Sequence, residues 1–433
     1  MRKSDKYVLL LVPFLVFALT LRYNHVMGWS QVNTLFYTDQ YINYSDALLN
    51  GEGYTTCAPQ FYSPCHDPNS PPSAYRLPGT PLLYAGIMLF SGLDDPFPSI
   101  RFIQALFSAL TAALVVDYAA RLFGARAGLV AGMLLIANPA PYYFAFWMLS
   151  ENLFLLLIAV LLYLLTFKRN TFLIGLCVGA MLLTRGSFLL TVPLLLFFIP
   201  RRRWWVFGIA IMLLVVPWIV RNAIEMHAFI PFSTGSGAVL YGANNPITFA
   251  SRSGAWNNPA FLPFWKTVGQ MGEVAQDRYL TSEALAFIRT QELSTLISVA
   301  IAKIRVLFIA NANPYPLLPF IVLMPIIIVR RIRRPSRVRL PEPARRPLLI
   351  IAALWIGLLL NTVIFWGDDR FRLPLDMTLA ILVGMLMFGL NPQSRDWTGI
   401  RTLRELPKPL SVGKSNLPDV PALPKSGISA SSD

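Results

Sequence analysis

Two acidic residues in polar surroundings are the first candidates for chemistry in this sequence. Asp39 lies in a run that also contains Tyr37, Tyr41 and Tyr44. Aromatic rings that exclude water raise the pKa of a nearby carboxyl group, which suits a general base working near neutral pH. Asp39 could also be the N-cap of a helix beginning in QYINYSDALL, and the two roles are compatible. Asp46, seven residues later, is the alternative acid.

A second acidic candidate begins an apolar run. Glu151 lies in WMLSENLF, at the expected start of a membrane helix. An acid at a helix N-terminus is stabilised by the helix dipole, so a structural role is one interpretation. Ionisable groups at the edge of membrane segments are commonly functional, which makes Glu151 a candidate for the same site as Asp39.

A set of basic residues flanks the apolar segments. Its members are Arg76, Arg185, Arg221, Lys303, Arg370 and Arg372. The forked donors of arginine fit phosphate oxygens well. Any one of these residues is more simply explained by pairing with lipid head groups, or with Asp368 and Asp369. The whole set favours a site for an anionic, phosphate-bearing ligand.

Other motifs give weaker signals. The turn-rich run Pro231–Pro246 could present backbone N–H groups to a phosphate or sugar, but its glycines match no phosphate-loop fingerprint. No histidine spacing is typical of a metal pair, so we predict no protein metal site. Cys57 and Cys65 would be able to form a disulfide if their loop lies outside the cytoplasm. Cys177 lies in an apolar run and is expected to be a small core residue.

The composition is that of a helical protein crossing the membrane many times. Of the 433 residues 55% are hydrophobic and 14% charged, and the mean hydropathy is +0.53. Lipid cannot solvate open backbone, so apolar runs of ~17–25 residues are expected to be helices. The net charge of +15 comes from clusters between and after these runs. Such clusters report orientation and argue against nucleic-acid binding.

We therefore predict an all-α polytopic membrane protein with about ten transmembrane helices. They are placed at 7–22, 97–118, 126–140, 150–167, 171–185, 187–199, 204–220, 315–331, 347–366 and 373–391. With the N-terminus inside, the short basic loops fall in the cytoplasm, and two long loops, 23–96 and 221–314, fall outside.

Three segments need separate predictions. Leu82–Leu93 is short for a crossing and is expected to be an external or re-entrant helix. Glu283–Ala310 is expected to be one amphipathic helix at the external interface. The membrane domain is predicted to cover 1–391, followed by a disordered cytoplasmic tail at 392–433, which is rich in Pro, Ser, Lys and Arg.

From about residue 7 to 391 the chain resembles the polytopic glycosyltransferases of the GT-C class. It is most similar to the bacterial relatives of dolichyl-phosphate-mannose protein mannosyltransferases and to lipid A aminoarabinose transferases. The order and spacing of several motifs carry the resemblance: LLNGEGY, YRLPGTPLLYAGIMLFSG, SENLF, LLTRGSFLL, PWIVRN, FIPFSTGSGAVLYGANNP and DRFRLPLDM.

The resemblance implies an enzyme that uses a polyprenyl-phosphate-linked sugar. Asp39 matches the first-loop catalytic acid, and Glu151 matches the second acidic position. Arg76, Lys303, Arg370 and Arg372 fall where the family has cationic residues, and we assign them, with Arg185, to the donor phosphate. The family usually has a tyrosine four residues after the first acid. Here that residue is Asn43, so Asp46 stays open as the catalytic acid.

The resemblance also implies a place and partners. The enzyme would be a multi-pass protein of the bacterial inner membrane, with its site on the periplasmic side, and its acceptor would be an envelope lipid, glycan or protein. Fixed cations can stabilise a leaving phosphate without a metal, but some GT-C relatives use a divalent metal, so the resemblance leaves metal use open.

Two other classes of function fit parts of the pattern. A transporter or lipid-linked sugar flippase would also have many helices, but its polar groups would lie near the middle of the membrane on broken helices. Here the polar residues gather at one face. A non-catalytic assembly subunit is the third interpretation.

Overall fold

The chain divides into two units, Met1–Leu390 and Asn391–Asp433. We describe a computed structural model through residues 3–28, 40–55, 70–91, 95–252, 268–309, 329 and 342–389, all of which lie in the first unit. These residues are helical apart from their connections. The strand-type pairing within them is an isolated antiparallel bridge between Thr55 and Pro72. The predicted all-α class is confirmed for this part of the chain.

The helices follow one another through short connections in the first two thirds of the unit. The α-helices of this part are α1 Lys3–Gly28, α2 Tyr41–Leu49, α3 Gly79–Ser91, α4 Phe97–Phe123, α5 Ala125–Ala137, α6 Ala140–Phe146, α7 Glu151–Tyr163, α8 Thr171–Thr184, α9 Val192–Leu195 and α10 Trp204–Glu225. The remaining α-helices are α11 Gly235–Ala243, α12 Pro246–Ser251, α14 Glu273–Arg289, α15 Leu293–Ile309, α17 Glu342–Ile364 and α18 Asp369–Gly384. Two of them, α7 and α18, continue as π-helical turns at Leu164–Lys168 and Met385–Gly389.

Six helices in the described residues are long and apolar enough to cross a membrane. They are Leu9–Gly28, Phe97–Phe123, Glu151–Lys168, Arg201–Glu225, Ala344–Ile364 and Arg370–Phe388. A seventh crossing is obtained if α5 and α6, bent by 50° at their junction, count as one. The structure thus supports a multi-pass protein, with six or seven of the ten predicted crossings.

Several predicted boundaries differ from the structure. Helix α1 is longer than the expected 7–22. The expected helix at 187–199 consists of 3-10 turns around the four-residue α9, in a stretch opened by Gly186 and interrupted by Pro193, which lacks an N–H. The expected helix at 315–331 lies almost wholly outside the described residues.

The two short apolar segments have different outcomes. Leu82–Leu93 corresponds to α3, a helix of 13 residues, which agrees with a segment too short for a crossing. The expected single helix Glu283–Ala310 is wrong, because α14 ends at Arg289 and α15 begins at Leu293. The hydroxyl of Thr290 donates to the Phe287 carbonyl and helps to end α14.

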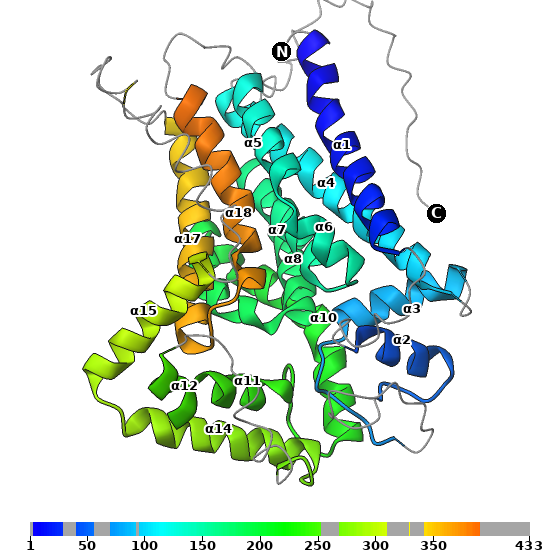
Figure 1. Cartoon of the computed structure of the whole chain (residues 1–433), viewed down its shortest axis with the longest axis vertical. Coiled ribbons are helices and arrows are strands. Elements are labelled where there is room, and N and C mark those ends of the chain that lie inside the picture. Colours follow the sequence, from blue (N-terminus) through cyan, green and yellow to red (C-terminus); the bar gives the residue numbers. More distant parts are fainter. Residues whose placement is uncertain are drawn as a thin grey trace, which may run out of the picture. The chain divides into compact units, whose positions relative to one another are not determined.

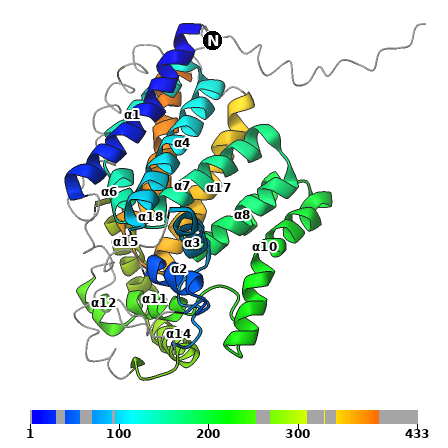
Figure 2. The same ribbon diagram turned by 90° about the vertical axis from the view of Figure 1, so that its right-hand side faces the viewer.

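Long helices form a bundle, and short helices gather at one end of it (Figures 1 and 2). Small residues let the long helices approach closely. At Gly175 of α8, a Cβ atom would lie 2.6 Å from the Ala210 Cβ and 2.7 Å from the Phe207 carbonyl oxygen of α10. Any larger residue at this position would force α8 and α10 apart. Helices α2, α11, α12 and α14 form the group of short helices in both views.

Candidate functional site

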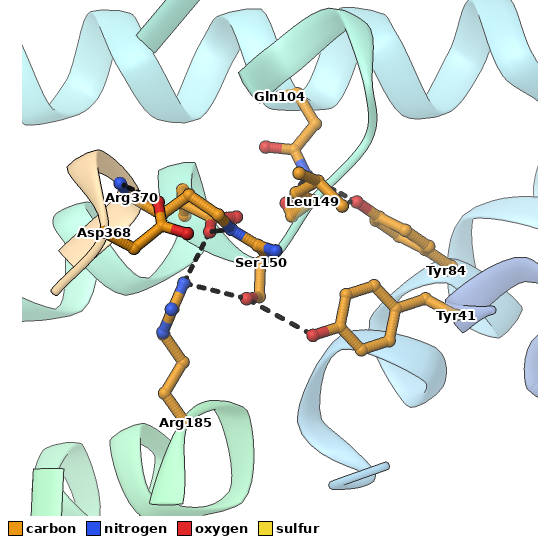
Figure 3. Close-up of polar contacts among 9 residues, drawn as sticks. Tyr41, Tyr84, Gln104, Leu149, Ser150, Arg185, Asp368 and Arg370 are labelled. Carbon is orange, nitrogen blue, oxygen red and sulfur yellow. Dashed lines mark hydrogen bonds and ion pairs between the residues drawn. The ribbon is translucent and has the colours of Figure 1, made fainter. Parts of the chain in front are cut away.

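A buried carboxylate lies between two arginines where three helices of the bundle meet (Figure 3). Glu151, the first residue of α7, has a 1% exposed side chain. Its Oε1 accepts hydrogen bonds from Arg185 Nη1, at the end of α8, and from Arg370 Nε, in the first turn of α18, both at 2.7 Å. One carboxylate between two guanidinium groups leaves a formal charge of +1, so the group suits an anionic ligand.

The turn before Glu151 is strained and held by side chains of other helices. Met148 has a φ of 52°, in the left-handed region that side chains other than glycine rarely adopt. The Tyr84 hydroxyl of α3 donates to the Met148 carbonyl at 2.6 Å. Gln104 Nε2 of α4 donates to the Leu149 carbonyl at 2.9 Å (Figure 3). Strain of this kind persists where the surroundings fix it, and it is common at functional sites.

A buried arginine supports the same turn from within α4. Arg101 is fully buried, and its Nε donates to the Phe146 carbonyl at 3.1 Å. Its guanidinium also lies 4.3 Å from the centre of the Phe146 ring, a cation–π contact. The residues that hold the start of α7 therefore come from helices remote from it in sequence.

The first loop reaches this cluster through Tyr41. Ser150 Oγ, next to Glu151, accepts hydrogen bonds from the Tyr41 hydroxyl and from Arg185 Nη1, each at 3.4 Å (Figure 3). Tyr41 is the first residue of α2, and the N-cap is Gln40. The alternative role of Asp39 as the N-cap is therefore wrong. Asp39 itself lies outside the described residues, two positions before Tyr41.

A small cavity of about 10 Å³ opens beside the glutamate. Its lining includes Glu151, Arg185 and Arg370, together with Ser187 and Asn361. This volume is about what one water-sized group needs. Polar atoms on both sides of the cavity thus meet a space that fits a single small group.

The other predicted cations contact different partners. Lys303 Nζ donates to Asn244 Oδ1 at 2.9 Å and to the Val363 carbonyl at 3.1 Å. Burial lowers the pKa of this lysine to about 8. Gly367 permits the arrangement, because a Cβ there would lie 2.0 Å from the Lys303 carbonyl oxygen. The amine is thus held between α11 and the end of α17.

Three further predicted residues also have partners within the protein. Arg372 is 1% exposed, and its Nε donates to Asp376 Oδ2 at 3.3 Å. Arg76 lies with its guanidinium 5.2 Å from the Tyr75 ring centre. Asp46 Oδ1 accepts from Asn50, one turn later in α2 and its C-cap, at 3.3 Å. The structure therefore brings together Glu151, Arg185 and Arg370 and places these three in other contacts.

The sixth cation joins the first loop to the bundle. Arg221, near the end of α10, donates to the Ser73 carbonyl at 2.7 Å and to the Tyr54 carbonyl at 2.6 Å. Glu273, the first residue of α14, accepts from the Ala74 amide at 2.8 Å and also from the Thr234 hydroxyl. Residues 54–76 are thus tied to segments that follow much later in the chain.

The turn-rich run Pro231–Pro246 forms α11 and its approach, and two of its amides have partners in the protein. The Gly237 amide donates to Asp277 Oδ1 at 2.7 Å, and the Gly235 amide donates to Ser233 Oγ at 2.9 Å. Burial raises the pKa of Asp277. These amides bind side chains of the protein, so the expected use of this run for a phosphate or sugar has no support at these two positions.

Two predicted features concern cysteines and metals. Cys57 and Cys65 lie outside the described residues, whereas Cys177 is a free, buried cysteine of α8, as predicted. Within the described ranges no group of three His, Cys, Asp or Glu side chains is placed to hold a metal ion.

Several residues of the site were not predicted from the sequence. Ser150, Tyr84, Gln104 and Asn361 lie in apolar surroundings, where their polarity alone gives no position in space. Arg101 carried a usable signal, because a charge within an apolar helix needs a specific partner.

A membrane-embedded helical protein with a buried, cationic polar site is the class that fold and geometry define. Residues 78–221 match the family model described as dolichyl-phosphate-mannose-protein mannosyltransferase. The matched segment is about a third of the chain and contains the helices that carry Glu151 and Arg185. Through this segment the chain belongs to that family of membrane glycosyltransferases, and the resemblance found in the sequence is confirmed.

Two solved structures are similar to the chain at a low level. The crystal structure of ArnT from Cupriavidus metallidurans bound to undecaprenyl phosphate is 15% identical, with a TM-score of 0.39, and the match covers 89% of this chain and 77% of that one. The apo state of ArnT from Cupriavidus metallidurans is 16% identical, with a TM-score of 0.36, and covers 81% and 72%. Likeness at this level supports no inference about function. No curated protein matches the chain significantly.

Proposed function

We propose that this glycosyltransferase moves a sugar from a polyprenyl-phosphate donor to an envelope acceptor, which is a lipid, a glycan or a protein. The observation that carries the proposal is the buried Glu151 carboxylate, which holds the guanidinium groups of Arg185 and Arg370 on one of its oxygens. A preorganised pair of cations in a place with little water stabilises the charge of a leaving phosphate without further reorganisation.

In the proposed reaction, Asp39 removes the proton of the acceptor nucleophile, which attacks the anomeric carbon of the sugar. The bond between this carbon and the phosphate oxygen breaks, and the electron pair stays on the polyprenyl phosphate. Arg185 and Arg370 bind that phosphate, and Arg76, Lys303 and Arg372 are further proposed contacts. Tyr41 supports the placement of Asp39, because it lies two residues later and its hydroxyl reaches Ser150 beside Glu151.

We place this reaction on the periplasmic side of a bacterial inner membrane. In this arrangement the membrane domain, 1–391, has about ten crossings, the loops 23–96 and 221–314 lie on the side of the site, and the tail 392–433 lies in the cytoplasm. The clusters of Lys and Arg between the apolar segments support this orientation.

Transfer from labelled polyprenyl-phosphate sugars in proteoliposomes tests the proposal. Asp39→Asn should lose about 10²–10⁴-fold in rate while still binding polyprenyl phosphate, because it removes only the general base. Arg370→Gln should lose about 10²–10³-fold, because it removes one stabilising charge. Arg289→Gln, an exposed arginine of α14, is the matched control and should transfer normally.

The outcome that contradicts the mechanism is also defined. If Asp39→Asn, Asp46→Asn and Glu151→Gln all kept full transfer, no carboxylate named here would take part. A wild-type protein that moves the labelled lipid across the bilayer without forming a covalent product would instead be a flippase.

A further inference from the structure

Two buried acceptor oxygens of the cavity have no partner in the described part of the chain. They are Glu151 Oε2, the carboxylate oxygen that faces away from both arginine contacts, and Asn361 Oδ1 near the end of α17. The two side chains are only 1% and 3% exposed. Both line the same cavity of about 10 Å³. Buried acceptors are nearly always hydrogen-bonded, so this pair requires a donor from a ligand.

The two kinds of polar atom in the cavity call for opposite partners. The arginines are donors only, and they match the oxygens of a phosphodiester, which carry no proton. The free oxygens of Glu151 and Asn361 are acceptors, and they need an O–H or N–H group. A phosphate alone therefore leaves the acceptor side of the cavity without partners.

Charge decides which donor fits. Glu151 already offsets part of the charge of Arg185 and Arg370, and the three together carry a formal charge of +1. A cationic amine or a metal ion would meet net repulsion there. A hydroxyl group is a neutral donor, and its size matches the water-sized space.

We propose that Glu151 Oε2 and Asn361 Oδ1 form a subsite that binds hydroxyl groups of the donor sugar, next to the arginines that bind its phosphate. The inference rests on the proposed function and adds a specificity determinant to it. Asn361 reads the sugar and takes no part in the bond changes. Arg370, 27% exposed, is the most accessible member of the ion cluster, and the sugar ring stays on its side while a hydroxyl enters the cavity.

A site built to bind a hydroxyl rejects an analogue that lacks it, because its own buried acceptors are left unpaired. Wild-type protein is given the sugar donor that it transfers in the proteoliposome assay and each monodeoxy form of that donor. At least one monodeoxy donor should have a kcat/KM lower by about 10-fold or more. Equal transfer of all these donors by the wild type would overturn the subsite.

Variants assign the effect to Asn361. Asn361→Ala and the milder Asn361→Ser should bring the ratio between the full and the discriminated deoxy donor towards one. Their affinity for polyprenyl phosphate without a sugar should match that of the wild type. Leu360→Ala, at the neighbouring and exposed position of α17, should keep the wild-type ratio.

The failure of this inference is distinct from the failure of the proposed function. If the wild type forms no glycosylated product, the proposed function is wrong. If the wild type transfers sugar and discriminates, but folded Asn361→Ala and Asn361→Ser keep every ratio, the proposed function stands and the subsite is wrong.

Discussion

Replacement of Glu151 by glutamine tests the central interaction of the site. The amide oxygen of glutamine can still accept from Arg185 Nη1 and Arg370 Nε, which now contact Oε1 at 2.7 Å. The negative charge is lost, however, and both hydrogen bonds change from charge-paired to ordinary. Hydrogen bonds to charged groups contribute about 1.5–3 kcal/mol, against about 0.5–1.5 kcal/mol for neutral ones.

The two weakened bonds set the expected size of the effect. A loss of about 1–1.5 kcal/mol for each bond gives about 2–3 kcal/mol in the free energy of unfolding, and repulsion between two unscreened guanidinium groups adds to it. Unfolding by SDS in mixed micelles measures this quantity. Glu283→Gln, an exposed glutamate of α14, is the control and should stay within about 0.5 kcal/mol of the wild type.

A Glu151→Gln protein as stable as the wild type would refute this account of the cluster. It would mean that the ion pairs contribute nothing net, so Glu151 would not be what holds the arginines in place. The transfer rate of the same preparation then shows whether any loss of activity follows from stability.

Two further predictions concern the surroundings of the site. Tyr84→Phe removes the hydroxyl that donates to the Met148 carbonyl, and it should lower the free energy of unfolding by about 1–3 kcal/mol, measured in the same SDS titration; an unchanged value would show that the strained turn holds itself. Lys303 has its pKa lowered to about 8 from the ordinary 10.5, so between these pH values the unfolded chain binds more protons than the folded one, and the stability of the wild type should rise from pH 8 to pH 10.5. Lys303→Met should lack that rise in unfolding titrations across this range, and a rise of the same size in the variant would exclude Lys303 as its source.

The sequence contained the charged members of the site but not their spatial arrangement. Glu151, Arg185 and Arg370 could be singled out because each charge at the end of an apolar segment needs a reason. The alternative partners proposed for Arg370 were lipid head groups, Asp368 and Asp369. The structure pairs it with Glu151, more than two hundred residues away in sequence, a contact that no local pattern reports.

Neutral polar residues were harder to predict. Asn361 lies in the apolar run LLLNTVIF, and Gln104 lies in an equally apolar part of α4. Composition gives such a residue no direction, because its role depends on which helix packs against its face. The break between α14 and α15 was missed for a related reason. Apolar residues continue on both sides of Thr290, and the end of α14 depends on a local hydrogen bond of that side chain.

The attachment of the first loop has a consequence for the order in which the protein is made. Ser73 and Ala74 are hydrogen-bonded by Arg221 and Glu273, which follow them by 148 and 199 residues. At a synthesis rate of about 5–20 residues per second, these partners emerge roughly ten seconds or more after the loop. The loop therefore waits, incompletely folded, until α10 and α14 exist. A chain truncated before residue 273 would keep Glu151 and Arg185 but would lack the last of the contacts that fix residues 73–76.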